Sequence, residues 1–285
     1  MKVLVTGSTG QLGSEFKKIS KKYKYDWVFK DSVQFNFFNT GKINSLLDNI
    51  NPEIIINCAA YTSVENAELD YESAKIINYK AIHLISKWSS INSCKLIHIS
   101  TDYVFDGKHT SPIGENEKPN PINNYGKSKL KGDLACLKYN PDSVIIRTSL
   151  LYSSYNNNFV KKIISKLKAK NMINVAIDQF SSPTYSADLC QVILKIIQSK
   201  NWIPGIYNFT NHGNMSIYDF AIEINKIFGG KILIRPIFLD NFSQLVKRPK
   251  YSVLDNSKII KMYGVMIKDY KISLKKCIEL IKNEK

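Results

Sequence analysis

Long apolar runs are missing from this chain of 285 residues. A helix that crosses a membrane needs about 20 consecutive apolar residues, so the sequence predicts no membrane partner. The chain also begins directly with a strand-like pattern, which predicts that no signal peptide precedes the fold. Both observations favour a cytoplasmic protein.

Cysteine and histidine are scarce and scattered. The five cysteines are Cys58, Cys94, Cys136, Cys190 and Cys277. Their number is odd, no two form a C-x-x-C pair, and the four histidines lack the spacing of metal ligands. This distribution is typical of a reduced compartment, and the sequence predicts no metal site.

Acidic residues are few relative to basic ones, and the formal net charge is +16. The lysines are spread along the whole chain, however, and no dense basic tract with interleaved aromatic residues is present. We therefore predict a solvated lysine-rich surface and no nucleic-acid partner. An anionic substrate would still be attracted to such a surface.

The first residues combine a strand pattern with a glycine-rich turn. Residues 1–6 are apolar and β-branched, as in a buried strand. Gly7, Gly10 and Gly13 follow in the spacing G-x-x-G-x-x-G, which allows a tight turn and a close approach to a pyrophosphate. A helix predicted over residues 11–22 would direct its N-terminal amides at the phosphates. We expect a bound dinucleotide; a glycine-rich turn without a ligand is the alternative.

Strand and helix patterns alternate through the first half of the chain. The predicted strands are 25–29, 52–57, 95–100 and 143–148, and the predicted helices are 41–50, 64–92 and a segment that contains Tyr125. This alternation predicts an α/β fold with a doubly wound parallel sheet, whose ligands bind at the carboxyl ends of the strands.

The regular alternation of strand and helix patterns ends at about residue 150. We predict helices over 156–170, 186–199 and 216–228, a loop over 178–184 and a short strand over 205–209. Residues 1–150 are therefore interpreted as a dinucleotide-binding domain. Residues 151–285 are interpreted as a smaller C-terminal substrate-binding lobe, with some elements returning to the main sheet.

Tyr125 and Lys129 lie four residues apart, so they share one face of a helix. A lysine cation on that face would stabilise a tyrosinate and lower the pKa of Tyr125 toward neutrality. Such a tyrosine can exchange a proton with an oxygen bonded to carbon. The Y-x-x-x-K pattern alone is a weak signal in a chain with 16 tyrosines.

Several segments, in order, resemble one known family. They are 5–13, 57–62, 100–105, 125–129, 147–149, 157–159, 178–184 and 248–249 with Ser252. The sequence is similar to the dTDP-4-dehydrorhamnose reductases, a branch of the extended short-chain dehydrogenase/reductases that acts on nucleotide sugars. The Thr-Asp-Tyr-Val-Phe segment at 101–105 and the Asp-Gln-x-x-x-Pro-Thr segment at 178–184 are more specific than the glycine turn.

The resemblance implies a Rossmann-like fold and the reduction of the 4-keto group of a dTDP-linked 6-deoxy-hexulose for polysaccharide synthesis. The implied catalytic residues are Thr101, Tyr125 and Lys129. The implied cofactor-binding residues are Gly7, Gly10, Gln11, Leu12, Gly13, Ala59, Ala60, Tyr61, Ser100, Tyr125 and Lys129. The implied substrate-binding residues are Thr62, Val64, Thr101, Asp102, Tyr103, Leu150 and Arg248. NADPH is the expected cofactor, NADH stays open, and so does a homodimer.

The sequence departs from the family's pattern at Leu150, where a tryptophan usually packs in the substrate pocket. This departure keeps a UDP- or GDP-linked 4-keto sugar open as the substrate. At the cofactor, Asn36 replaces an expected aspartate, while Lys30 and Asp31 leave the choice between NADP and NAD undecided. Glu15 is a position at which some relatives use a glutamate in a metal-bridged dimer, but the sequence supplies no clear partner carboxylates.

Structural roles are an alternative for several of these residues. Thr101 and Asp102 would also suit a turn after a strand, Tyr103 would suit the core, and Thr62 would suit the start of a helix. A non-catalytic regulatory subunit of the same fold is a further alternative. It is disfavoured because Thr101, Tyr125 and Lys129 are all present.

Overall fold

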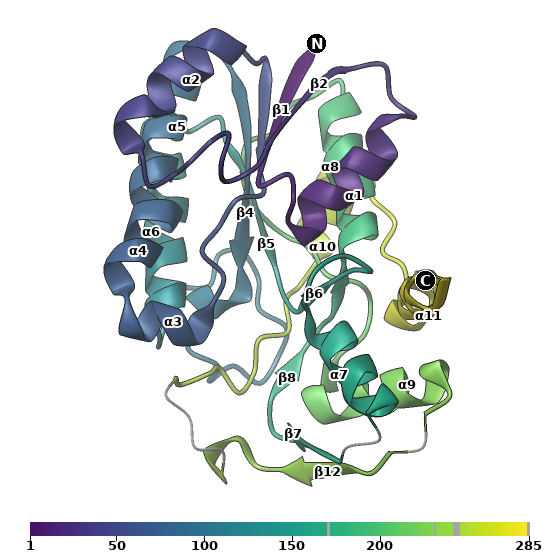
Figure 1. The fold of residues 1–285 in the computed structure, drawn as a ribbon. Helices are drawn as coiled ribbons and strands as arrows, with labels where there is room; N and C mark the ends of the chain where they lie inside the picture. The colour runs from purple at the N-terminus through teal and green to yellow at the C-terminus, as the bar shows by residue number, and fades with distance from the viewer. Residues whose placement is uncertain (170–171, 231, 242–245, 284–285) are drawn as a thin grey trace.

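The centre of the protein is a six-stranded parallel sheet in the order β10-β5-β4-β3-β1-β2 (Figure 1). The computed structural model describes residues 1–285 except 170–171, 231, 242–245 and 284–285. The strands are β1 (Lys2–Thr6), β2 (Asp26–Lys30), β3 (Ile54–Asn57), β4 (Lys95–Thr101), β5 (Val144–Thr148) and β10 (Gly205–Asn208). The strand order reverses at β1, which confirms the predicted doubly wound fold and places its switch point between β1 and β3.

Two layers of helices cover the sheet (Figure 1). One layer consists of α2 (Ile43–Ile50), α5 (Ala81–Ile91) and α6 (Asn124–Tyr139); the other consists of α1 (Gln11–Ser20), α8 (Ser186–Gln198) and α10 (Ser257–Tyr263). Neighbouring strand residues point to opposite layers: Leu4 and Ile55 pack with the first, whereas Val5 and Ile56 pack with the second. Burial on both faces explains why β1 and β3 are almost continuously apolar.

The region predicted as one helix over residues 64–92 is divided into four pieces, so the single helix was wrong. The pieces are α3 (Val64–Leu69), α4 (Tyr71–Lys75), the π-helical segment η2 (Ile76–Lys80) and α5. Asp70 separates α3 from α4, because its carboxylate accepts a hydrogen bond from the Ser73 amide and caps α4. The π-helical segment buries Asn78, whose side chain donates to the Tyr61 carbonyl and accepts from the Tyr61 amide. Asn78 thereby fixes the loop that follows β3.

A second core lies below the sheet in Figure 1. Its elements are β6 (Leu151–Tyr152), α7 (Phe159–Lys168), β7 (Ile173–Ala176), β9 (Thr184–Tyr185), β11 (Met215–Ser216), α9 (Ile217–Phe228), β12 (Ile234–Ile237) and α11 (Tyr270–Asn283). The short strand β8 (Phe180–Ser181) lies outside this core. The loop predicted over 178–184 was partly wrong, because β8 pairs with β11 and β9 pairs with β6. These partners are distant in sequence, so local patterns could not reveal them.

Part of the C-terminal half packs on the main sheet. β10 pairs with β5, and α8 packs against α1. The boundary at residue 150 stays a prediction. Within the residues that the structure describes, no helix is both long enough and apolar enough to cross a membrane.

Candidate active site

The glycine-rich turn lies at the switch point of the sheet. Gly7 follows β1 with a φ of +65°, and a Cβ atom there would lie 2.7 Å from the Ala59 amide nitrogen. A Cβ at Gly13 would lie 2.3 Å from the Gly7 carbonyl oxygen. Gly10 is the N-cap of α1, and the first turn of that helix carries no acidic residue. The N-terminus of α1 therefore meets the requirements of a phosphate site.

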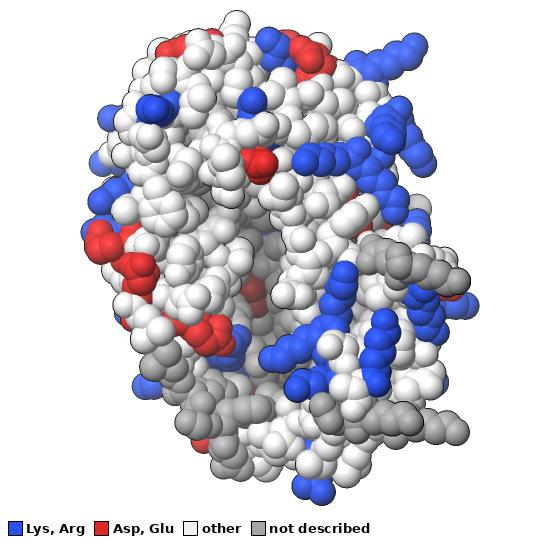
Figure 2. Space-filling model, in the orientation of Figure 1, with Lys and Arg blue, Asp and Glu red and all other residues white. Residues whose placement is uncertain are grey.

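A cavity of about 680 Å³ extends from this turn along the carboxyl ends of β1, β3, β4 and β5. It forms the hollow at the centre of the face shown in Figure 2. The predicted residues that line it are Gly7, Gly10, Gln11, Leu12, Ala59, Ala60, Thr62, Val64, Ser100, Thr101, Asp102, Tyr103, Tyr125, Lys129 and Leu150. Its volume suits a ligand the size of a cofactor or a drug.

Three predicted site residues are absent from the described cavity wall: Gly13, Tyr61 and Arg248. Gly13 packs beneath the glycine turn. The backbone of Tyr61 is bound to the Asn78 side chain. Arg248 donates to the Tyr103 hydroxyl over 3.0 Å and also forms an ion pair with Glu65. These residues support the wall rather than form it.

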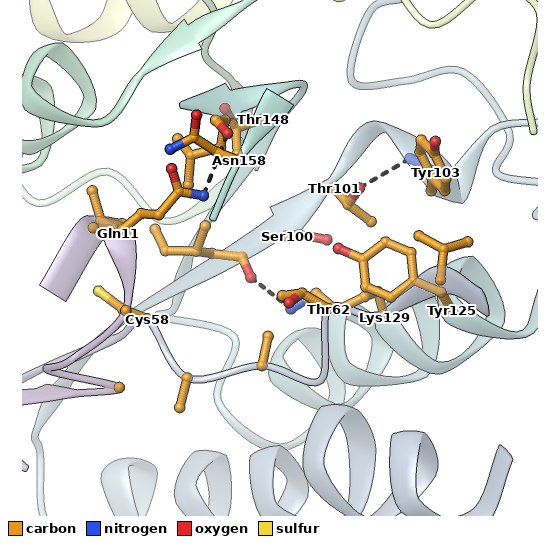
Figure 3. A pocket seen from close by; sticks show the side chains of 18 of the residues that line it. Gln11, Cys58, Thr62, Ser100, Thr101, Tyr103, Tyr125, Lys129, Thr148 and Asn158 are labelled. Carbon is orange, nitrogen blue, oxygen red and sulfur yellow. Dashed lines mark hydrogen bonds between the residues drawn. The ribbon is translucent and has the colours of Figure 1, made fainter. Parts of the chain in front are cut away.

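Tyr125 and Lys129 project from the start of α6 toward the end of β4, as Figure 3 shows. Asn123 caps this helix, because its side chain accepts a hydrogen bond from the Gly126 amide over 2.8 Å. The side chains of Tyr125 and Thr101 are hydrogen-bonded to each other. Lys129 is only 2% exposed, and its Nζ donates to the Ile99 carbonyl oxygen over 2.7 Å.

The electrostatics of this pair differ from the prediction. Burial raises the pKa of Tyr125, and the hydrogen bond with Thr101 opposes that rise only in part. Burial lowers the pKa of Lys129 to about 8, while Asp133 acts in the opposite direction. The predicted lowering of the Tyr125 pKa by Lys129 was therefore wrong, because desolvation is the largest effect on both groups. Tyr125 is neutral at pH 7, the form that can donate a proton.

A group of hydroxyls surrounds Asp102 at the base of the cavity. The Asp102 carboxylate accepts hydrogen bonds from Ser149 over 2.7 Å and from Thr101 over 3.1 Å, and it is also bonded to Ser252. Burial raises the pKa of Asp102, and these hydroxyls oppose the rise. Ser149 and Ser181 share a hydrogen bond of 2.5 Å.

Ser149, Ser181 and Ser252 all line the cavity but were not predicted as site residues. Each lies in a segment that resembles the family, which is the one signal that could have indicated them. Their grouping around Asp102 depends on the tertiary fold.

Thr101 and Tyr103 have structural contacts as well as positions in the cavity wall. The Thr101 hydroxyl accepts a hydrogen bond from the Tyr103 amide over 3.2 Å and caps the short turn Asp102–Val104. The Tyr103 ring packs edge-on against the Tyr125 ring, with centroids 5.7 Å apart. A structural role and a role in the site are therefore compatible for both Thr101 and Tyr103. The predicted cap role of Thr62 was wrong, because Ser63 caps α3.

The far end of the cavity is formed by residues after β2. Asp31 lies there with Asn36 and three aromatic residues, Phe35, Phe37 and Phe38. The Asp31 carboxylate accepts hydrogen bonds from the amides of Val33 and Gln34, which lower its pKa. The aromatic residues were not predicted as part of the site.

Leu150 lies in the cavity wall with a φ of +43°, in the left-handed region that leucine rarely adopts. Glu15 is buried elsewhere in the structure, and burial raises its pKa. In the described part of the chain, no three His, Cys, Asp or Glu side chains are grouped as a metal site would require.

Comparison with known proteins places this site in a family. The family described as "RmlD substrate binding domain" matches residues 1–283. The dTDP-4-dehydrorhamnose reductase of Aggregatibacter actinomycetemcomitans is 35% identical, over 96% of this chain and 97% of the relative.

Two crystal structures are similar over almost the whole chain. A dTDP-4-dehydrorhamnose reductase from Clostridium acetobutylicum has a TM-score of 0.94 at 36% identity and covers 99% of this chain and 100% of that one. The Bacillus anthracis enzyme of the same name, in complex with NADP, has a TM-score of 0.93 at 34% identity and covers 98% and 99%. The chain therefore belongs to the RmlD family of dTDP-4-dehydrorhamnose reductases.

Proposed function

We propose that this protein reduces the 4-keto group of dTDP-4-dehydro-L-rhamnose with NADPH and forms dTDP-L-rhamnose, a precursor of surface polysaccharides. The observation that carries the proposal is the convergence of Thr101, Tyr125 and Lys129 on one cavity that also contains the glycine-rich turn. The relatives named as dTDP-4-dehydrorhamnose reductases support the choice of substrate.

The cavity fits a nicotinamide dinucleotide. Gly7 and Gly10 would hold the pyrophosphate, and Ala59 and Ala60 would lie beside it because they follow the adjacent strand β3. When bound, the cofactor supplies the hydride that reduces the ketone. The NADP in the Bacillus anthracis relative favours NADPH. NADH stays open because the ionised Asp31 carboxylate lies at the end of β2, where it could bind ribose hydroxyls.

Tyr125 would donate its proton to the substrate oxygen as negative charge develops there. Its raised pKa suits this role, because the neutral phenol is the donor form. The Thr101 hydroxyl would hydrogen-bond the same oxygen, and Lys129 would hold the ribose hydroxyls of the cofactor. Thr62, Val64, Asp102, Tyr103 and Leu150 would contact the sugar nucleotide. Arg248 would act by holding Tyr103.

The test is the loss of NADPH absorbance, and separately of NADH absorbance, when purified protein meets freshly generated dTDP-4-keto-6-deoxy-L-hexulose. We expect rapid oxidation with dTDP-L-rhamnose as the product. Tyr125→Phe should lower kcat at least about 100-fold, because it removes the proton donor. The same variant should bind NADPH as the wild-type protein does, measured by cofactor fluorescence. Full turnover in Tyr125→Phe would refute the assignment of Tyr125.

A second candidate is a 4-ketoreductase for a UDP- or GDP-linked sugar. It is motivated by Leu150, which lines the cavity where the family usually has an aromatic residue. A panel of nucleotide-linked 4-keto sugars separates the two candidates, since only one nucleotide should give rapid turnover. If no sugar reacts and a stable heteromeric partner is recovered, the protein is a non-catalytic regulatory subunit and both reductase candidates are refuted.

Three further statements belong to this proposal. The protein would act in the cytoplasm, residues 151–285 would complete the sugar-nucleotide site through wall residues such as Ser181 and Ser252, and the chain would form a homodimer. Light scattering after size-exclusion chromatography tests the last of these directly.

A further inference from the structure

Four ionisable side chains meet beneath the cavity floor, between the sheet and α6. They are His98 on β4, Lys129 and Asp133 on α6, and Arg147 on β5, and none is more than 2% exposed. Charged side chains are almost never buried to this degree unless they are paired. The arrangement therefore has a cause beyond packing, and Lys129 is its link to the cavity.

The contacts join these groups in a short chain. Arg147 Nε donates to Asp133 Oδ2 over 3.3 Å, and its guanidinium lies 5.3 Å from the centroid of the Phe105 ring. Asp133 Oδ1 lies 3.9 Å from His98 Nε2, and the same nitrogen lies 3.4 Å from Lys129 Nζ. Asp133 follows Lys129 by four residues, so both point from one face of α6.

The surroundings leave Asp133 as the anion that faces Lys129. Burial and the charge of Lys129 lower the pKa of His98, so the imidazole is neutral. The Asn57 amide donates to His98 Nδ1 over 2.9 Å and fixes the ring. On α6, burial raises the pKa of Cys136 to about 12 and also raises that of Tyr125, so both are uncharged at neutral pH.

Asp133 stabilises the ammonium form of Lys129 against the effect of burial. Burial also raises the pKa of Asp133 itself, whereas Arg147 and Lys129 lower it. Because a guanidinium is charged at every accessible pH, Arg147 favours the ionised form of the Asp133 carboxylate at all of them and opposes the effect of burial. The Asp133 carboxylate thus pairs with the Arg147 guanidinium and acts on the Lys129 ammonium through its charge. Of these two buried cations, Lys129 titrates and Arg147 does not.

We propose that Asp133, held by Arg147, is a positioning residue that keeps Lys129 in its ammonium form at neutral pH. The inference rests on the proposed function, in which the Lys129 ammonium binds the ribose hydroxyls of the cofactor. A neutral amine would donate fewer hydrogen bonds there. The reductase should therefore lose activity as the pH rises and Lys129 releases its proton.

The first experiment is the pH profile of kcat/KM for NADPH, which reports the ionisations of the free enzyme. In the wild-type protein we expect an alkaline limb at about pH 8. Asp133→Asn should move this limb down by about one pH unit, because an opposite charge nearby has been removed. Asp133→Glu should leave the limb closer to the wild-type position. Asp142→Asn is the matched control, because this exposed carboxylate lies beyond the end of α6.

The second experiment is an NMR titration of Lys129 through its ¹³C-labelled side chain, which needs no turnover. It separates failure of this inference from failure of the proposed function, since it remains valid if no sugar is reduced. A lower midpoint for Lys129 in Asp133→Asn supports the inference, and an unchanged midpoint overturns it. If Asp133→Asn does not fold, the wild-type titration decides. An ammonium at pH 7 with a midpoint near 8 supports the inference, and a neutral amine at pH 7 overturns it.

Discussion

At the scale of single residues, burial has opposite consequences for the two groups of the Y-x-x-x-K pattern. It disfavours the charged form of each, so it raises the pKa of Tyr125 and lowers that of Lys129. For a reductase the first effect is useful, because the neutral phenol must donate. The second effect weakens the fold, because an ammonium is held out of water. Lys129 should therefore favour activity at the expense of stability.

This conflict predicts the behaviour of Lys129→Met. The unfolded lysine has its ordinary pKa of about 10.4, whereas the folded one is lowered to about 8. The unfolded state then binds more protons between these values, so wild-type stability should rise as the pH increases from about 8 to 10. The variant lacks this group. At pH 7 its free energy of unfolding in urea should exceed that of the wild type by up to about 3 kcal/mol. Loss of the hydrogen bond from Lys129 to Ile99 should reduce this gain.

Measuring wild type and Lys129→Met at two pH values provides an internal control. Groups remote from Lys129 titrate alike in the two proteins, and the lowered pKa of His98 keeps that group neutral above pH 7. The difference between the two free energies of unfolding therefore reports mainly on Lys129. That difference should shrink by about 3 kcal/mol between pH 7 and pH 10.5, and the variant should not oxidise NADPH. A difference independent of pH would show that Lys129 has an ordinary pKa in the folded protein.

Sequence reasoning found the residues that carry a family motif, but it missed those that depend on the fold. Tyr125, Lys129 and Thr101 were identified from spacing and resemblance, and all three line the cavity. Asp133 lies four residues after Lys129, so the helix spacing could have indicated it. The contacts of His98 with α6 could not be inferred, because they require the register of β4 against the helix.

At the scale of secondary structure, α6 is held very close to its neighbours. A Cβ at Gly132 would lie 2.3 Å from the Asn78 carbonyl oxygen in the π-helical segment, and a Cβ at Gly126 would lie 2.1 Å from the Tyr103 carbonyl oxygen. Both neighbours are backbone atoms, which cannot rotate away. These two glycines therefore set how closely α6 approaches the site.

Gly132→Ala should push α6 away from the segment that carries Asn78. Alanine favours a helix by about 1 kcal/mol over glycine, but the clash should outweigh that gain and destabilise the protein by about 1–3 kcal/mol. Gly114→Ala is the matched control, because a Cβ there meets nothing within 4 Å. Urea midpoints measure both effects. A Gly132→Ala protein as stable as Gly114→Ala would contradict the close packing of α6.

The elements themselves were largely predictable where one pattern continued long enough. The apolar strands of the sheet and the capped helix α9, in which Ser216 and Asp219 form a capping box, agree with the sequence. The division of residues 64–92 was missed, although Asp70 and Ser73 form a recognisable cap. The π-helical segment gives no local signal, since Asn78 adopts its position through contacts with Tyr61 and Ser128.

At the scale of the whole molecule, charge is distributed unevenly around the cavity. In Figure 2 the acidic side chains gather to the left of the central hollow, over α3 and α4, and basic ones gather to its right, over α1 and α7. The net charge of +16 adds a positive potential to the entire surface. The proposed cofactor and substrate both carry phosphates. Their approach should therefore be accelerated by the field of the protein.

This field predicts a steep dependence on ionic strength. Raising KCl from about 0.02 M to about 0.2 M shortens the Debye length to below 10 Å, so kcat/KM for NADPH should fall about three- to tenfold while kcat changes little. NADH is the matched control, because it has the same shape without the extra phosphate, and its decline should be shallower. Initial rates at fixed pH across a salt series measure both slopes. Equal slopes for the two cofactors would place the extra phosphate outside the positive field, and no slope for either would mean that the basic surface does not assist binding.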